Sequence, residues 1–139
     1  MQATACRTKL FRKGPIFREG DKGDAMFVIK TGRVRITKNL HGIMVKIADL
    51  GPGDHFGEMA LIEGVPRSAT AIADSQVEAD VYDRKALKEL VASDPEFAFT
   101  MLQEMSHRLR QIDERLTDLV AKGRLPRDEA SKFGPNTTC

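Results

Sequence analysis

The sequence predicts a mainly β fold that is followed by helices. Short β-rich runs occupy the chain as far as Tyr82, and clusters containing Gly or Pro separate them at intervals of about ten residues. A helical pattern takes over at Asp83. Regular short strands with such turns are typical of a barrel, a roll or a sandwich, and the pattern does not choose among them. The length of 139 residues fits one domain that buries a core without metal or disulfide staples.

The β-rich runs lie between turn clusters and vary in how clearly they alternate. Residues 34–37 alternate apolar with polar side chains, as expected of a half-buried strand. Residues 1–9 are weakly patterned, and we expect them to lie across the strands. The predicted strands include residues 26–30, 34–38, 43–47, 70–73 and 77–82, and the turn clusters are residues 13–15, 19–24, 31–32, 41–42 and 51–54.

Two helices are predicted after the last strand. Asp83 is a good N-cap for a helix over residues 84–92. A second start signal follows at once, because Ser93 and Asp94 place capping side chains before Pro95, which suits a first helical turn. Gly123 is the predicted stop. The helices therefore span about residues 84–122.

One face of the second helix carries an apolar seam whose spacings alternate between 4 and 3 residues. This is a heptad pattern, and a narrow stripe of this kind suits a partner helix. We therefore favour a homodimer through residues 98–119 over the alternative, in which the stripe packs on the chain's own strands. The first turns, with Phe97, Phe99 and Met101, are expected to anchor to those strands. The seam residues are Ala98, Leu102, Met105, Leu109, Ile112, Leu116 and Leu119.

Residues 56–71 combine groups that suit a phosphorylated sugar. Gly57 opens a short apolar helical turn, and a helix start offers an anion free N–H groups and a positive dipole end. Residues 63–66 then break the helix, and Arg67 follows, whose guanidinium forms a two-pronged contact with phosphate oxygens. The ionised Glu58 only accepts hydrogen bonds, so it suits a ribose hydroxyl. Taken singly, the arginine also fits a solvated surface and the Gly-Glu pair a helix cap.

Residues 56–70 read Phe-Gly-Glu at their start and Pro-Arg-Ser-Ala-Thr at their end. This order is similar to the phosphate-binding cassette of the cyclic nucleotide-binding domain family, which includes the catabolite activator protein, protein kinase A regulatory subunits and cyclic-nucleotide-gated channels. Residues 17–34 resemble the early strands of that family, and the likeness covers about residues 10–120. It implies an antiparallel β-roll (jelly-roll-like, a double-stranded β-helix) with C-terminal helices. We expect a domain over residues 1–123, with the roll over about 10–82.

The resemblance also implies the ligand and its contacts. Arg67 falls on the family's phosphate arginine and Glu58 on its ribose glutamate, and Ser68 directly after the arginine leads us to expect cAMP in preference to cGMP. The long helix sits where the family carries its lid, and its candidates to cover the base are Arg108, Leu109, Arg110, Ile112 and Arg115. The implied ligand-binding residues are Phe56, Gly57, Glu58, Met59, Ala60, Arg67, Ser68, Ala69 and Thr70. No metal and no other cofactor is implied.

Composition and scattered residues argue against other classes. The 22 Lys and Arg nearly balance the 20 Asp and Glu, so the net charge of +2 does not favour a nucleic acid partner. No apolar run approaches the roughly 18 residues of a membrane span and no signal peptide is present, so a cytoplasmic location is predicted.

Cys6 and Cys139 are interpreted as free thiols. His41, His55 and His107 are scattered, which disfavours a metal site and a cupin-like enzyme. We expect no catalysis.

The end of the chain bears on function. Residues 124–139 are polar and interrupted by Pro and Gly, so we predict a mobile tail that is too short for a helix-turn-helix module. We therefore expect no DNA binding by this chain alone. The predicted function is a sensor that binds a cyclic nucleotide, moves its helices and acts on an unknown downstream protein. The alternatives are a homodimeric scaffold that uses no nucleotide, or the sensor fragment of a transcription regulator.

Overall fold

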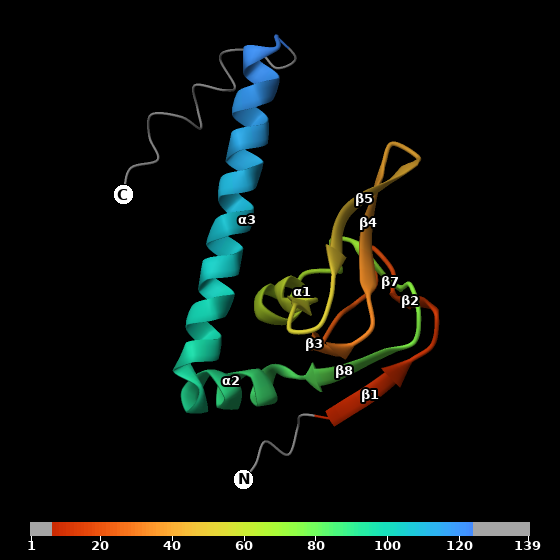
Figure 1. Cartoon of the computed structure of the whole chain (residues 1–139), viewed down its shortest axis with the longest axis vertical. Coiled ribbons are helices and arrows are strands. Elements are labelled where there is room, and N and C mark those ends of the chain that lie inside the picture. Colours follow the sequence, from red (N-terminus) through yellow and green to blue (C-terminus); the bar gives the residue numbers. More distant parts are fainter. Residues whose placement is uncertain (1–6, 124–139) are drawn as a thin grey trace. The chain divides into compact units, whose positions relative to one another are not determined.

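The structure is a computed structural model that describes residues 7–123, in which there are eight strands and three helices, the first helix lying between β6 and β7 and the other two following β8 (Figure 1). The predicted fold class, an antiparallel β-roll with C-terminal helices, is confirmed. The strands are β1 (Arg7–Phe11), β2 (Gly14–Phe17), β3 (Met26–Thr31), β4 (Val34–Leu40), β5 (Ile43–Leu50), β6 (His55–Phe56), β7 (Thr70–Ala73) and β8 (Val77–Tyr82). The helices are α1 (Glu58–Glu63), α2 (Arg84–Ser93) and α3 (Pro95–Ala121).

The strands form two antiparallel sheets of four strands each. One sheet has the order β1-β8-β3-β6 and the other the order β2-β7-β4-β5. Successive strands mostly alternate between the sheets, so the chain winds around the core instead of completing one sheet before the next. The register places Met26 opposite Tyr82 in the first sheet and Val34 opposite Ala73 in the second. This winding brings α1, which lies between β6 and β7, beside β3.

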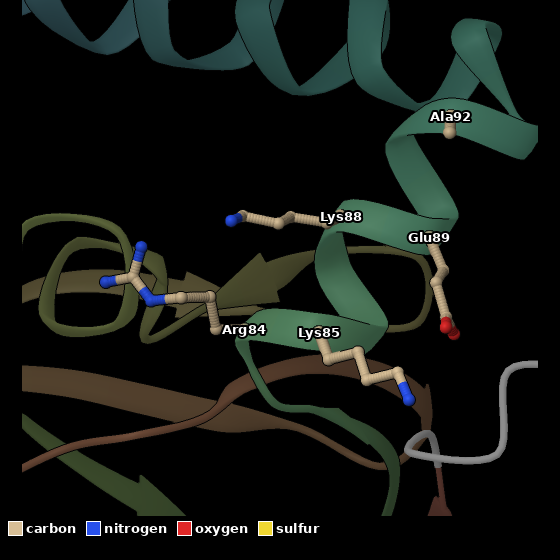
Figure 2. Close-up of a pocket in the computed structure, with 5 residues that line it drawn as sticks. All are labelled: Arg84, Lys85, Lys88, Glu89 and Ala92. Carbon is tan, nitrogen blue, oxygen red and sulfur yellow. The ribbon is translucent and has the colours of Figure 1, made fainter.

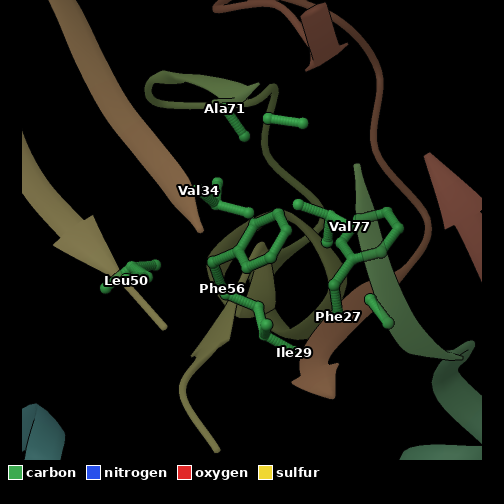
Figure 3. Packing of buried hydrophobic residues seen from close by; sticks show 9 residues of the cluster. Phe27, Ile29, Val34, Leu50, Phe56, Ala71 and Val77 are labelled. Atoms are coloured by element: carbon green, nitrogen blue, oxygen red, sulfur yellow. The ribbon is translucent and has the colours of Figure 1, made fainter. Parts of the chain in front are cut away.

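The core of the roll pairs large aromatic side chains with small ones (Figure 3). The rings of Phe27 and Phe56 stack with their centroids 5.0 Å apart, and Phe17 lies 5.9 Å from each of them. Ala71 and Ala73 are fully buried on β7, where their small side chains leave room for these rings. Truncation of either stacked phenylalanine to alanine would cost about 3–5 kcal/mol of the free energy of unfolding.

The hairpin of β4 and β5 projects beyond the other strands (Figure 1). Its two-residue connection has positive φ at both His41 and Gly42, 55° and 87°, which is the left-handed turn that matches the twist of a hairpin. The apolar side chains of Leu40, Ile43 and Met44 at its tip are exposed.

The helix starts after the roll follow the predicted capping. The Asp83 carboxylate accepts from the Ala86 N–H at 2.8 Å, and the Asp94 carboxylate accepts from the Phe97 N–H at 3.1 Å. Contacts divide the chain into two compact units between Ser93 and Asp94, so that α2 belongs with the roll and α3 forms its own unit. Within residues 7–123, no helix is long and apolar enough to cross a membrane.

Several boundaries differ from the sequence prediction. Residues 7–9 do not lie across the strands as expected, because they belong to β1, where Arg7 pairs with Val81 and Lys9 with Ala79. This strand shows no alternation in the sequence since its first four side chains are all exposed. Helix α3 ends at Ala121, shortly before Gly123. The predicted mobile tail, residues 124–139, and both cysteines, Cys6 and Cys139, lie outside the described residues.

Candidate functional site

The segment that carries the predicted site is built around α1. Gly57 has φ 84° and precedes the helix with no side-chain cap, and Glu58 is the first helical residue. Gly64 ends the helix at φ 72°, and its N–H donates to the carbonyl of Ala60 at 2.9 Å. The helix start at Gly57 is therefore as predicted, whereas the break begins at Gly64, one residue later than predicted, because Glu63 is still helical. The N–H groups of the first turn receive no cap from the Gly57 side, which suits an anion.

Arg67 is buried and fixed at both its backbone and its guanidinium. Its Nη1 donates to the carbonyl of Gly57 at 2.8 Å and its Nη2 to the carbonyl of Ala25 at 2.9 Å. The Arg67 N–H donates to the carbonyl of Asp21, and the Arg67 carbonyl accepts from the N–H of Gly20, both at 2.8 Å. Only 6% of the residue is exposed. The arginine therefore joins the end of the cassette to its start at Gly57 and to the loop between β2 and β3.

Two glycines make room for the guanidinium. A Cβ at Gly23 would overlap the Nε and Cζ atoms of Arg67, and a Cβ at Gly57 would lie 2.8 Å from its Nη1. The opposite side is formed by Phe17, whose ring centroid lies 4.0 Å from the guanidinium carbon. Within residues 7–123, the Nε of Arg67 is buried and has no hydrogen-bond partner. An acceptor such as a phosphate oxygen would satisfy that donor.

Three acidic groups act on the charge of Arg67. Burial lowers the pKa of Arg67 below its ordinary value, and the negative charges of Asp24, Asp21 and Glu58 act in the opposite direction. An arginine stays protonated in proteins, so the guanidinium keeps its charge in this site. Since this charge lies next to a bare helix start, the arrangement suits a small anion more than a metal ion. Within residues 7–123, no cluster of three or more His, Cys, Asp and Glu side chains is placed to hold a metal.

Glu58 is buried beside a histidine that the sequence interpretation left out of the site. Glu58 is 5% exposed, and its Oε1 lies 3.2 Å from Nδ1 of His55 on β6. His55 is itself 2% exposed. The sequence interpretation treats His55 as one of three scattered histidines. Its spacing of three residues from Glu58 across a glycine turn was the signal that could have indicated a contact.

The remaining predicted site residues fall into different environments. Phe56, Ala60 and Ala69 are buried, whereas Met59 and Ser68 are exposed. The Thr70 hydroxyl accepts from the N–H of Glu19 at 2.9 Å. These residues lie on one continuous cassette, but Thr70 is already engaged by a neighbouring loop, and Phe56 belongs to the core.

The five lid candidates, Arg108, Leu109, Arg110, Ile112 and Arg115, all lie on α3, in the second compact unit. Arg110 Nη2 lies 3.3 Å from Nδ1 of His107, so part of this guanidinium is engaged along its own helix. Leu109 and Ile112 are exposed. That these residues cover a ligand stays a prediction.

A hollow of about 520 Å³ follows one side of α2 and is lined by Arg84, Lys85, Lys88, Glu89 and Ala92 (Figure 2). Neither Glu58 nor Arg67 lines it. Arg84 reaches from the start of α2 to the last turn of α1, where its Nη2 donates to the carbonyl of Leu61 at 2.7 Å. The hollow therefore borders the contact that joins α2 to the cassette helix, and the predicted phosphate and ribose contacts lie elsewhere.

The roll, the cassette and the seated arginine together define a class of ligand-binding domain. Residues 8–94 match the model of the cyclic nucleotide-binding domain family. The chain belongs to this family.

Individual relatives agree with that assignment. The chain is 36% identical over 115 residues to a cyclic AMP receptor protein of Thermus thermophilus, covering 81% of this chain and 53% of that protein. It is 33% identical over 106 residues to a CRP-like cAMP-activated global transcriptional regulator of Mycobacterium tuberculosis, covering 76% and 47%. The crystal structure of Thermus thermophilus catabolite activator protein superposes with a TM-score of 0.76 at 34% identity, covering 86% and 56%. The chain spans about half the length of these relatives.

Proposed function

We propose that the cassette binds cAMP, with Arg67 holding the cyclic phosphate and Glu58 the ribose 2′-hydroxyl. The observation that carries this proposal is the seat of Arg67, a buried and charged guanidinium beside a bare helix start, with an Nε donor that has no partner within residues 7–123. A cationic ligand would be repelled by this charge, whereas a phosphate oxygen would accept a hydrogen bond from the Nε donor. Glu58 lies on the first turn of the same helix, where a carboxylate accepts from a sugar hydroxyl.

The two curated relatives support cAMP as the nucleotide, because each is described by its response to it. Ser68 follows Arg67 directly, and we expect a cAMP preference of modest size with measurable cGMP binding. The remaining cassette residues would shape the site through their backbone, and Gly57, Ala60 and Ala69 also through their small size; they are Gly57, Met59, Ala60, Ala69 and Thr70. No further cofactor is proposed.

Titration calorimetry with cAMP, cGMP and linear 5′-AMP tests this function. We expect cAMP to bind most tightly, cGMP more weakly, and 5′-AMP weakest because its extra charge and open phosphate fit the buried guanidinium poorly. Absence of heat and of any thermal shift with cAMP would favour the alternative, a homodimeric scaffold or protein-interaction module that keeps the fold and uses no nucleotide.

We further propose that binding is transmitted by movement of the C-terminal helices. A ligand shifts an equilibrium only if it binds one state better, so a mobile element must respond to the occupied cassette. The contact of Arg84 with the Leu61 carbonyl supports α2 as the first element to respond, since it ties the start of α2 to the end of α1. α3, which follows α2 directly, is the proposed lid and output helix.

The proposed assembly is a homodimer through residues 98–119 of α3. Its support is the heptad seam, in which Leu102, Leu109 and Ile112 are more than half exposed. Analytical ultracentrifugation with and without cAMP tests it, and a monomer at all concentrations would contradict it.

The unknown downstream protein, the cytoplasmic location and the lack of both catalysis and DNA binding stay predictions. A role as the sensor portion of a transcription regulator is favoured over the scaffold by the similarity to the CRP-like cAMP-activated global transcriptional regulator.

A further inference from the structure

His55 lies directly behind the carboxylate assigned to the ribose. Its Nδ1 is 3.2 Å from Oε1 of Glu58, and both side chains are almost completely buried, at 2% and 6% exposure. A contact between two buried polar groups is strong because neither has water to compete for it. The contact therefore helps to set the direction in which the Glu58 carboxylate faces.

The backbone holds His55 in place independently of Glu58. β6 consists of only His55 and Phe56, and it pairs with β3, with Val28 opposite His55 and Phe27 opposite Phe56. Phe56 is locked in the aromatic core by its stacking on Phe27. The left-handed turn at Gly57 then reverses the chain, so that Glu58 comes back against the imidazole three residues earlier. The core thus sets the position of His55, and His55 sets that of Glu58.

We infer that His55 is a positioning residue for recognition of the ribose 2′-hydroxyl. An imidazole that carries its proton on Nδ1 donates to Oε1 of Glu58, and this orients the carboxylate to accept from the sugar. The inference rests on the proposed function, because it gives His55 a role only through Glu58 and a nucleotide ribose. It predicts that substitution of His55 lowers the affinity for nucleotides that carry a 2′-hydroxyl and has little effect on the affinity for nucleotides that lack it.

The test compares cAMP with 2′-deoxy-cAMP on a matched pair of variants. Leucine and asparagine have the same shape, and the asparagine amide nitrogen occupies nearly the place of imidazole Nδ1. Both variants therefore leave the same space in the core, and only His55→Asn keeps a donor for Glu58. We measure both affinities by calorimetry, and the melting temperature of each variant.

We expect His55→Leu to weaken cAMP about tenfold and 2′-deoxy-cAMP less than about twofold, since one hydrogen bond to an ionised group is lost. His55→Asn should hold cAMP within about threefold of the original chain. If His55→Leu does not fold, His55→Gln replaces it. Its amide nitrogen lies near the Nε2 position of histidine, so it should lose cAMP affinity where His55→Asn does not.

Equal losses for both nucleotides would show that His55 only fills the core, and no loss for either would show that Glu58 needs no orientation. Either result overturns the inference and leaves cAMP binding by the original chain intact. An original chain that binds neither nucleotide instead overturns the proposed function, and the inference with it.

Discussion

The guanidinium of Arg67 lies over the ring of Phe17, with its central carbon 4.0 Å from the ring centroid. Phe17 also contacts Phe27 and Phe56, so the ring that supports the arginine is itself part of the hydrophobic core. The cation and the core are therefore packed as one unit. Rotation of the guanidinium away from its position would break this contact and both carbonyl hydrogen bonds.

Replacement of Arg67 by alanine should weaken cAMP binding by about 2–5 kcal/mol, because a buried phosphate charge loses its partner. Calorimetry measures this directly. The control is Arg35→Ala, which removes an exposed ion pair with Asp74 and should change binding by less than about 0.5 kcal/mol. If Arg67→Ala binds cAMP within a few-fold of the original chain, the phosphate assignment is wrong.

Replacement of Glu58 by alanine should weaken cAMP binding less, by about 1–3 kcal/mol, since one hydroxyl contact is lost. Glu63, the other acidic residue of α1, is exposed and provides the control Glu63→Ala, for which we expect no change. Both variants are compared by titration with cAMP. A loss of equal size in the two variants would mean that Glu58 acts through the general charge of α1.

Substitution of Gly23 by alanine should weaken cAMP binding by about 1–3 kcal/mol, because the added methyl group overlaps the seat of the Arg67 guanidinium. The matched control is Gly51→Ala, whose methyl group meets the end of Arg33, an exposed side chain that can move away. In an Arg67→Ala background, Gly23→Ala should add no further loss. Additive losses in this double-mutant cycle would contradict the steric explanation.

Ser68→Thr should shift the nucleotide preference toward cGMP by about three- to tenfold, the range expected of one additional hydrogen bond. The expectation rests on the resemblance, which implies that a threonine directly after the arginine often favours cGMP through the guanine amino group. Competition between cAMP and cGMP measures the shift, with the exposed Ser75→Thr as control. A clear cGMP preference of the unchanged chain would contradict the expected cAMP preference and would indicate that Ser68 or Thr70 already recognises guanine.

Hydrogen exchange should detect the proposed switch. With cAMP, we expect protection to rise over residues 57–71, where ligand contacts would form, and over residues 105–118 of α3, which carry the lid candidates. Protection confined to the cassette would mean that binding is local and that α3 is a static dimer strut. A control titration with 5′-AMP, which should bind weakly, corrects for effects of nucleotide on solution conditions.

The sequence predicted the features that depend on near neighbours. Asp83 and Asp94 cap helices, and Gly57 and Gly64 bound α1, because each of these functions needs only residues up to four positions away. The sequence does not predict the edge strand β1, because its first four side chains are all exposed and the alternation that marks a half-buried strand is absent.

The contacts that complete the candidate site could not be predicted from the sequence, because they join residues that are far apart along the chain. Arg67 donates to Ala25, which is 42 positions earlier, and no local pattern indicates which distant carbonyl a guanidinium meets. Glu58 and Arg67 themselves were recognised from their place in the cassette. The site role of His55 was not recognised. Its spacing of three residues from Glu58 predicts a contact only if the left-handed turn at Gly57, which brings Glu58 back against His55, is known.

The absence of a side chain at position 23 has a consequence for the history of the family. The backbone there has no positive φ that would demand glycine, and the three atoms nearest to an added Cβ all belong to the Arg67 side chain. A lineage that loses the arginine no longer has a reason to keep the glycine, and larger residues become neutral at that position. Aligned relatives should therefore show the two positions changing together, and a glycine at 23 without the arginine would mark a recent loss of the ligand.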